Sequence, residues 1–206
     1  MKIAIIGSGH VGGALAQRFI QVGHTVLVGV RYPLSMRSVL LAMKIGEDRF
    51  TTVESAAQQS EVVVLATSTM AAIDVTRELG DTTGKVIIDT MNAGRGRGPE
   101  GFHNTTEAIM ANTLTPDVAK CFNATGYEIM LDPHFGDQAA DMFVCGPSRK
   151  AKQVATQLAK DIGFGECYDL GGRDKFSLIE QLASVWIELA LVQGYGRKIA
   201  FKLLKR

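Results

Sequence analysis

Short, continuous apolar runs recur along the chain, and segments with a helical pattern of apolar residues separate them. The runs lie at residues 2–6, 25–30, 62–66, 85–89 and 118–123, with a shorter one near 50–53. Uninterrupted runs of this kind are typical of parallel strands that are buried on both faces. The helical pattern is clear where Val11, Leu15 and Phe19 repeat on one face, and it predicts further helices at 33–45, 54–59, 71–79 and from about residue 105. This alternation indicates an α/β fold with a Rossmann-like, doubly wound parallel sheet.

The last third of the chain continues the pattern in a smaller unit. It predicts strands at 141–145 and 166–170, an amphipathic helix at 148–162 and a long apolar helix at about 175–192. We therefore expect a Rossmann domain over residues 1–116 and a small C-terminal α/β portion over 117–206. The long apolar helix also predicts a homodimer, because wide apolar faces often mark contacts between subunits.

A glycine-rich turn joins the first strand to the first helix, in the sequence Gly7-Ser8-Gly9-His10-Val11-Gly12. Gly7 makes the tight turn, Gly9 leaves room for the backbone to approach a pyrophosphate, and Gly12 lets the helix pack close to the sheet. The unpaired N–H groups and the dipole at the start of the helix favour negative charge. Because a strand precedes this turn and a helix and a second strand follow it, the six residues predict a dinucleotide-binding site.

The residue at the end of the second strand indicates which dinucleotide binds. A site that prefers NAD places Asp or Glu there to accept hydrogen bonds from the ribose 2′-hydroxyl, whereas this chain has Arg31. A guanidinium can bind a phosphate through two parallel hydrogen bonds, and no acidic residue occurs in residues 1–46. Both observations predict NADP(H), with Arg31 as the main determinant. Arg37, in the next helix, is a second candidate, and the alternative there is a solvated side chain.

Polar residues also follow the later strands, at the carboxyl ends where ligands bind in open α/β sheets. Thr67 and Ser68 are candidates to bind a ribose or a phosphate, although residues of this type also cap helices. Asn92 and Asn123 end strands on the expected nicotinamide side. There they would orient the carboxamide or the second substrate, or else form turns with their own backbone.

Composition narrows the partners and the compartment. The 206 residues include 22 Lys and Arg and 21 Asp and Glu, a net charge of +1, so the chain has no overall field for nucleic acid or an anionic membrane. We therefore expect small-molecule ligands. The three Cys are well separated, which favours reduced thiols over disulfides or a metal site. The chain shows no secretory leader and no apolar stretch of the ~18 residues that a membrane span needs, so we expect a cytoplasmic protein.

The motifs that the sequence lacks limit the chemistry. None of the four Tyr has Lys four residues later, which excludes the usual proton relay of short-chain dehydrogenases, and no His, Cys, Asp or Glu cluster has the spacing of metal ligands. The sequence thus indicates no metal and identifies no catalytic residue. His10 and His134 are candidates for contacts with the pyrophosphate or a substrate, and an exposed surface position is the alternative for each. A chain without an evident proton donor suits hydride transfer between two bound redox cofactors, which the protein positions and shields from water.

Specific motifs extend from the first strand to the C-terminus. They are Ile5-Ile6-Gly7-Ser8-Gly9, Val28-Gly29-Val30-Arg31, Gly98-Pro99-Glu100-Gly101-Phe102, Lys120-Cys121-Phe122-Asn123-Ala124-Thr125-Gly126, Asp132-Pro133-His134-Phe135-Gly136, Met142-Phe143-Val144-Cys145-Gly146 and Gly194-x-Gly196-Arg197-x-Ile199-Ala200-Phe201-x-Leu203-Leu204. These motifs resemble those of the NADPH-dependent deazaflavin (coenzyme F420) reductases and their bacterial relatives. More distantly, they resemble the cytosolic NADPH domains of the six-transmembrane metalloreductases. The resemblance implies NADP(H) at Gly7–Gly12 and Arg31, with a flavin-like partner stacked near the nicotinamide.

The resemblance predicts an enzyme that passes hydride between NADPH and a deazaflavin or flavin-type acceptor, namely coenzyme F420, FMN or FAD, bound by the C-terminal portion. Val30 departs from the family, which often has Ser there, so Arg31 carries more of the discrimination between NADP and NAD. Quinone and ferric-chelate acceptors stay open. So do two other functions: a non-catalytic NADPH-binding redox sensor, and a reductase of small imines similar to pyrroline-carboxylate reductase, which usually has a longer helical dimerisation domain.

Overall fold

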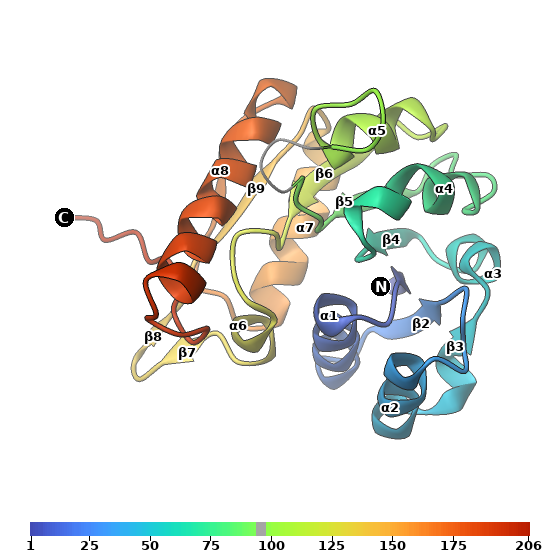
Figure 1. Ribbon diagram of the computed structural model, residues 1–206, viewed down its shortest axis with the longest axis horizontal. Helices are drawn as coiled ribbons and strands as arrows, with labels where there is room; N and C mark the ends of the chain where they lie inside the picture. Colours follow the sequence, from blue (N-terminus) through green and yellow to red (C-terminus); the bar gives the residue numbers. More distant parts are fainter. Residues whose placement is uncertain (94–97) are drawn as a thin grey trace.

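The computed structural model describes residues 1–93 and 98–206, and over these residues it contains an eight-stranded sheet with helices on both faces (Figure 1). The strand order is β10-β9-β6-β5-β4-β1-β2-β3, and its last six members have the order of a Rossmann sheet. The strands of this sheet are β1 (Lys2–Ile6), β2 (Thr25–Gly29), β3 (Phe50–Thr51), β4 (Val62–Leu65), β5 (Val86–Asp89), β6 (Val118–Cys121), β9 (Met142–Cys145) and β10 (Cys167–Asp169). The predicted α/β fold is confirmed. Residues 94–97 lie outside the described residues.

Two layers of helices cover the sheet. One face packs against α1, α6 and α7, and the other against α3, α4, α5 and α8. The helices are α1 (His10–Gln21), α2 (Met36–Ile45), α3 (Val53–Gln58), α4 (Ala72–Arg77), α5 (Thr105–Ala111), α6 (Tyr127–Leu131), α7 (Arg149–Asp161) and α8 (Phe176–Ile187). Short 3-10 turns lie at Glu47–Arg49, Thr69–Ala71 and Arg173–Lys175, and α8 continues into a π-helical turn at Glu188–Val192.

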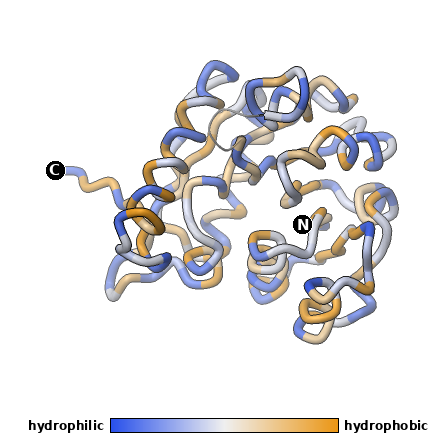
Figure 2. Tube along the Cα trace, in the orientation of Figure 1, coloured by the Kyte–Doolittle hydropathy of each residue, from blue (hydrophilic) through white to orange (hydrophobic). Residues whose placement is uncertain are grey.

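The core explains why the strands read as unbroken apolar runs. Ile3 and Ile5 of β1 pack with α1 on one face, while Ala4 and Ile6 pack with α3 on the other, and all four are fully buried. Successive side chains of a strand point to opposite faces, so a strand with a helix layer on each side needs apolar residues at every position. Along the helices, apolar and polar residues alternate around the axis (Figure 2). The carboxyl ends of the strands are therefore supported by apolar packing on both faces of the sheet.

The last two strands depart from the predicted parallel arrangement. β6 pairs antiparallel with β9, and β10 then pairs parallel with β9. A parallel connection needs a helix that crosses the sheet face. Between β6 and β9 the chain instead forms the one-and-a-half turns of α6 and the small hairpin of β7 (His134–Phe135) and β8 (Gln138–Ala139), so it re-enters the sheet in the opposite direction. The sequence pattern missed both elements, because each is too short to show a period.

Candidate functional site

The glycine turn between β1 and α1 has the geometry that its sequence predicts. Gly7 has a φ of +111°, and a Cβ there would lie 2.6 Å from the Ala66 carbonyl oxygen, so no other residue fits without strain. A Cβ on Gly12 would lie 2.1 Å from the Gly7 carbonyl oxygen, which enforces close helix packing. A Cβ on Gly9 would meet no protein atom within 4 Å. The space beside Gly9 is therefore open, as it must be for a ligand to lie against the backbone.

The start of α1 is prepared for an anion. Its N-cap, Gly9, has no side chain to accept a hydrogen bond from the first backbone N–H groups, and the first turn contains no acidic residue. The N–H groups at a helix N-terminus carry partial positive charge and bind phosphate when no side chain caps them. The start of α1 is thus suited to a pyrophosphate, and binding of a pyrophosphate by Gly7–Gly12 stays a prediction.

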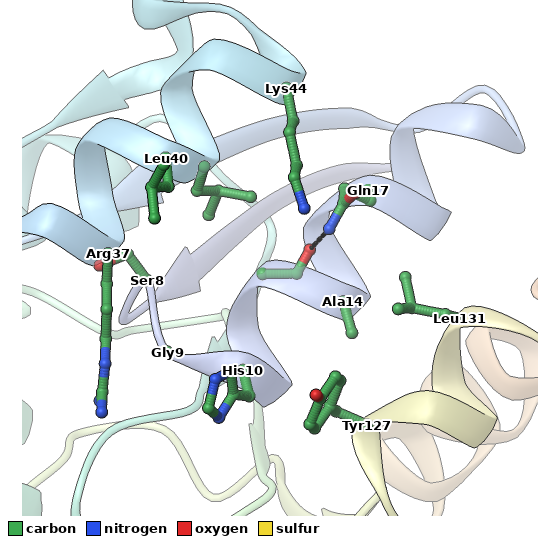
Figure 3. Close-up of a pocket in the computed structure, with 12 residues that line it drawn as sticks. Ser8, Gly9, His10, Ala14, Gln17, Arg37, Leu40, Lys44, Tyr127 and Leu131 are labelled. Carbon is green, nitrogen blue, oxygen red and sulfur yellow. Dashed lines mark hydrogen bonds between the residues drawn. The ribbon is translucent and has the colours of Figure 1, made fainter. Parts of the chain in front are cut away.

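Three cavities open around this turn, two of them at the carboxyl ends of the central strands and one between helices. The loop cavity, of about 410 Å³, runs from the glycine turn past Thr67 and Ser68 to Thr90 and Met91. The β2 cavity, of about 150 Å³, lies beside Arg31. The helix cavity, of about 280 Å³, lies between α1, α2 and α6 (Figure 3). Of the predicted residues, Ser8 lines all three cavities, whereas Arg31 lines the β2 cavity alone.

Arg31 has an acidic neighbour that its local sequence did not reveal. Its guanidinium Nη1 lies 3.7 Å from Glu78 Oε1, and the two side chains are 38% and 40% exposed. The guanidinium also lies 6.0 Å from the ring centre of Tyr32. Exposed ion pairs of this kind contribute about 0–1 kcal/mol, so Glu78 restrains the guanidinium without sequestering it from a phosphate.

A cluster of three serine hydroxyls stands beside Arg31. Ser38 Oγ lies 2.8 Å from Ser8 Oγ and 2.9 Å from Ser35 Oγ, and it donates to the Tyr32 carbonyl at 3.1 Å. Ser35 caps α2 by accepting from the Ser38 backbone N–H, and the first turn of α2 contains no acidic residue. The hydroxyls of the serine cluster and the partial positive charge at the N-terminus of α2 therefore add to the attraction that Arg31 exerts on an anion. Sequence reasoning missed Ser35 and Ser38, and the helix-cap pattern at the start of α2 was the available signal.

Arg37 lies on the other side of the glycine turn from the β2 cavity. It lines both the helix cavity and the loop cavity, and its side chain extends from α2 past Ser8 and Gly9 (Figure 3). The structure therefore does not bring Arg31 and Arg37 into one cavity. In the helix cavity, Lys44 points toward Gln17, whose amide donates to the Gly13 carbonyl at 2.9 Å.

His10 is held in an aromatic stack. Its ring lies 4.8 Å from the ring of Tyr127, at an interplanar angle of 18°. The Arg197 guanidinium lies 5.3 Å from the Tyr127 ring and 5.5 Å from the Trp186 ring, and its Nε donates to Glu128 Oε1 at 2.5 Å. Burial raises the pKa of Glu128, but Arg197 outweighs burial and holds that pKa below its usual value. The stack thus ties the first residue of α1 to the C-terminal segment.

The two predicted asparagines bind each other. Asn92 Nδ2 donates to the Asn123 carbonyl, and Asn123 Nδ2 donates to Asn92 Oδ1, both at 2.8 Å. The hydroxyl of Thr69 also donates to the Asn92 carbonyl, at 2.7 Å. Asn123 is 5% exposed, and its Oδ1 is a buried acceptor with no partner among the described residues. Phe122, just before it, has a φ of +61°, a strained conformation for a non-glycine residue. Asn123 Oδ1 is thus a buried acceptor left unpaired by the described residues, and neither asparagine lines any of the three cavities.

The remaining candidates have simpler surroundings. Thr67 Oγ1 donates to Met91 Sδ at 3.4 Å, and Ser68 is the N-cap of the following 3-10 turn without a side-chain cap bond. His134 lies in the β7–β8 hairpin, where its ring pairs with Asp132 at 3.0 Å and lines none of the three cavities. Within residues 1–93 and 98–206, no group of three or more His, Cys, Asp or Glu is arranged to hold a metal ion, and no helix has the length and apolarity to cross a membrane.

Taken with this geometry, comparison with known proteins shows that the chain is similar to NADP-dependent oxidoreductases built on a Rossmann-type sheet. Residues 2–93 match the model of a family described as NADP oxidoreductase, coenzyme F420-dependent. The F420-dependent NADP reductase of Methanothermobacter marburgensis is 26% identical over 209 residues, with 92% of each chain covered. The matches confirm the resemblance predicted from the sequence: the chain is similar to F420-dependent oxidoreductases.

Two further relatives support this placement. The crystal structure of a proposed F420-dependent NADP reductase from Arthrobacter sp. FB24 superposes with a TM-score of 0.85 at 26% identity, and the match covers 100% of both chains. The metalloreductase STEAP3 of Rattus norvegicus is 23% identical over 164 residues. That match covers 79% of this chain but 32% of the metalloreductase, so the chain spans about a third of that relative's length.

Proposed function

We propose that this protein transfers hydride between NADPH and a deazaflavin or flavin-type acceptor. The observation that carries the proposal is the β2 cavity, where Arg31 stands beside the serine cluster and the N-terminus of α2. NADP carries a 2′-phosphate that such a site would bind and that NAD lacks. A carboxylate at the end of β2 would instead repel that phosphate. When bound, NADPH supplies a hydride from its nicotinamide ring.

Ser35 and Ser38 offer hydroxyls that the chain lacks at position 30. Related proteins often have Ser at this position, and this chain has Val30. Both hydroxyls line the β2 cavity together with Arg31. Because the Ser38 hydroxyl donates to the Tyr32 carbonyl, the donors for a phosphate dianion would be the Arg31 guanidinium and the Ser35 hydroxyl at the end of a capped helix. In this proposal the serine cluster replaces the missing side chain at Val30.

The predicted residues on the other side of the glycine turn would hold the rest of the cofactor. The N–H groups at the start of α1 would bind the pyrophosphate, with Arg37 alongside. Thr67 and Ser68 line the loop cavity beyond the glycine turn. In this proposal the unpaired Oδ1 of Asn123 would accept from the amide protons of the nicotinamide carboxamide. Burial favours such a bond, because an unpaired buried acceptor is costly.

The acceptor side would come largely from residues 117–206. The stacked rings of His10 and Tyr127 place a flat aromatic surface beside the glycine turn, and Arg197 backs it. Hydride transfer to a deazaflavin needs a flat ring held against the nicotinamide with water excluded, and the one proton that completes the reaction can come from solvent. The relative from Methanothermobacter marburgensis bears the name of an F420-dependent reductase, which supports a deazaflavin as the first acceptor to test.

The outward face of α8 would form a homodimer contact. Figure 1 shows α8 at the edge of the molecule, and exposed apolar residues lie along it and the turn that follows: Leu178, Val185, Ile187, Leu191 and Val192. Apolar residues exposed in this way are often covered in oligomers. Light scattering at micromolar concentration would show twice the chain mass of 22.2 kDa.

Stopped-flow oxidation of NADPH tests the proposal. The purified protein is mixed with NADPH and then with coenzyme F420, FMN, FAD, a quinone or a ferric chelate in separate runs. We expect fast single-turnover oxidation with the deazaflavin or a flavin, and much slower oxidation of NADH. Tight NADPH binding without oxidation by any of these acceptors would contradict the proposal.

A further inference from the structure

A lysine is buried in the centre of the sheet between two carboxylates. Lys120, on β6, is fully buried, and its Nζ lies 2.8 Å from Asp89 Oδ2 at the end of β5 and 2.8 Å from Glu180 Oε1 on α8. The contact with Asp89 is a well-directed hydrogen bond, whereas that with Glu180 is an ion pair without hydrogen-bond geometry. The sequence hid this group, because all three residues lie within apolar segments.

Two hydroxyls complete the group, which we call the buried ion cluster (Asp89, Lys120, Glu180, Thr105 and Thr106). Both threonines donate to Asp89 Oδ2, at 2.5 and 2.7 Å, and Lys120 donates to Thr105 Oγ1 at 2.9 Å. Burial raises the pKa of Glu180, against the opposing effect of the Lys120 ammonium and the Ala93 backbone N–H. Burial lowers the pKa of Lys120, but the two carboxylates outweigh it, so the ammonium stays charged.

The buried ion cluster contacts the backbone just after β5, where the chain reaches the candidate site. Asp89 uses its second oxygen, Oδ1, to accept from the Met91 backbone N–H at 2.9 Å, and Glu180 faces the backbone N–H of Ala93. Between these two points, Thr90 and Met91 line the loop cavity. Asp89 thus fixes the start of the segment 89–93 with a hydrogen bond, Glu180 lies beside its end, and Thr90 and Met91 between them form part of the wall of that cavity.

A second contact joins α8 to the same place. Asn123 Nδ2 donates to Asn92 Oδ1 at 2.8 Å and lies 3.3 Å from the carbonyl oxygen of Ile179, the residue before Glu180. The asparagine pair and the buried ion cluster therefore bind α8 to neighbouring points on β5 and β6. Any shift of α8 would move residues 89–93 and Asn123 together.

Stability alone does not account for two carboxylates around a buried lysine. Removing charges from water is costly, and replacing buried ion pairs with apolar residues of similar volume is often neutral or stabilising. Such groups can instead select one arrangement of the elements they join, because each partner must be satisfied in a single geometry. Here the selected arrangement is that of α8 against the nicotinamide side of the site.

We propose that the buried ion cluster is a positioning device, in which Glu180 on α8 sets residues 89–93 and Asn123 for the nicotinamide half of NADPH. This inference rests on the proposed function only for the identity of the cofactor. Glu180 touches neither the glycine turn nor the β2 cavity, so the adenosine half binds independently of it.

Two ligands separate the two halves of the site. NADPH occupies both halves, whereas 2′,5′-ADP carries the adenosine and 2′-phosphate without a nicotinamide. In Glu180→Leu we expect calorimetric affinity for NADPH to fall about fivefold or more, and affinity for 2′,5′-ADP to stay within about twofold. The single-turnover rate of hydride transfer should fall about tenfold or more, since small displacements of reacting groups are costly. Glu180→Gln, which keeps an acceptor for Lys120, should show a smaller loss and so rescue part of the effect.

Glu107→Gln is the matched control. Glu107 lies on α5 and pairs at the surface with Arg173 at 3.6 Å. We therefore expect Glu107→Gln to leave the affinities for NADPH and 2′,5′-ADP unchanged. Equal affinities of Glu180→Leu and the wild-type protein for NADPH would overturn the positioning proposal, as would equal losses for both ligands. If wild-type protein binds NADPH but reduces no acceptor, the proposed function fails, while the ratio of the two affinities still decides the role of the cluster. Circular dichroism checks that Glu180→Leu is folded, and Glu180→Gln provides the comparison if it is not.

Discussion

If the β2 cavity binds the 2′-phosphate as proposed, loss of the Arg31 guanidinium should leave a site that distinguishes NADPH from NADH far less well. In Arg31→Ala the 2′-phosphate keeps the hydroxyl of Ser35 and the N-terminus of α2. It loses a pair of charge-assisted hydrogen bonds, each of which contributes about 1.5–3 kcal/mol. Arg31 is 38% exposed, so solvent screens part of this contribution. We take a loss of about 2 kcal/mol, which is roughly a 30-fold weaker Kd.

Substitution of Glu78 should have the opposite effect on the affinity for NADPH. It lies 3.7 Å from Arg31 Nη1 and competes with the 2′-phosphate for the guanidinium. Breaking an exposed pair costs about 0.2–1 kcal/mol, so Glu78→Gln should tighten NADPH binding by up to about fivefold. The effect should shrink at high salt, which screens surface charges.

Isothermal titration calorimetry with NADPH, NADH and 2′,5′-ADP measures both effects. We expect Arg31→Ala to weaken the binding of NADPH and of 2′,5′-ADP and to leave the affinity for NADH unchanged. Equal loss for NADPH and NADH would show that Arg31 supports the fold or the adenosine rather than the phosphate. No loss for any ligand would refute the assignment of the β2 cavity.

Three further predictions concern the glycine turn, a buried carboxylate and the outer face of α8. Gly9→Ala should leave the Tm unchanged, because its Cβ meets no protein atom within 4 Å, and should weaken the affinity for NADPH about tenfold because the Cβ intrudes on the ligand. Gly12→Ala should instead lower the Tm. Unchanged affinity of folded Gly9→Ala for NADPH would contradict this. Burial raises the pKa of Asp141, but hydrogen bonds from Lys202 and two backbone N–H groups hold it below its usual value. Its stabilisation is therefore present above the unfolded-state pKa of about 3.9 and is lost as the pH falls below it, so Asp141→Asn should flatten the fall of Tm with pH in acid; an unchanged slope would argue against it. Val185→Glu should give a 22.2 kDa monomer in light scattering, and a wild-type protein of that same mass would remove the dimer proposal.

Most of the fold could be predicted because its pattern is local. Strands of the Rossmann half are buried on both faces and read as apolar runs, and the glycine turn follows from two close approaches and one positive φ. The reversal at β9 could not be predicted, since α6 and the β7–β8 hairpin are too short to show a period.

The site was predictable only where its residues are neighbours in sequence. Gly7–Gly12 and Arg31 follow from motif and position, whereas the pairing of Arg31 with Glu78 joins residues 47 positions apart and depends on how α4 packs beside β2. The burial of Lys120 was equally hidden, because a lysine in a strand normally faces solvent. Side chains that meet across the sheet need the tertiary structure to be seen together.

The most direct test of the central claim follows the hydride itself. NADPH deuterated at the transferable position of nicotinamide C4 is oxidised by the protein with coenzyme F420, and the reduced deazaflavin is analysed by mass spectrometry. A deazaflavin receives hydride at a carbon, where the label does not exchange with water. The account predicts one deuterium per reduced deazaflavin. Reduction without the label, or no reduction of the deazaflavin or of any flavin by NADPH, would contradict it.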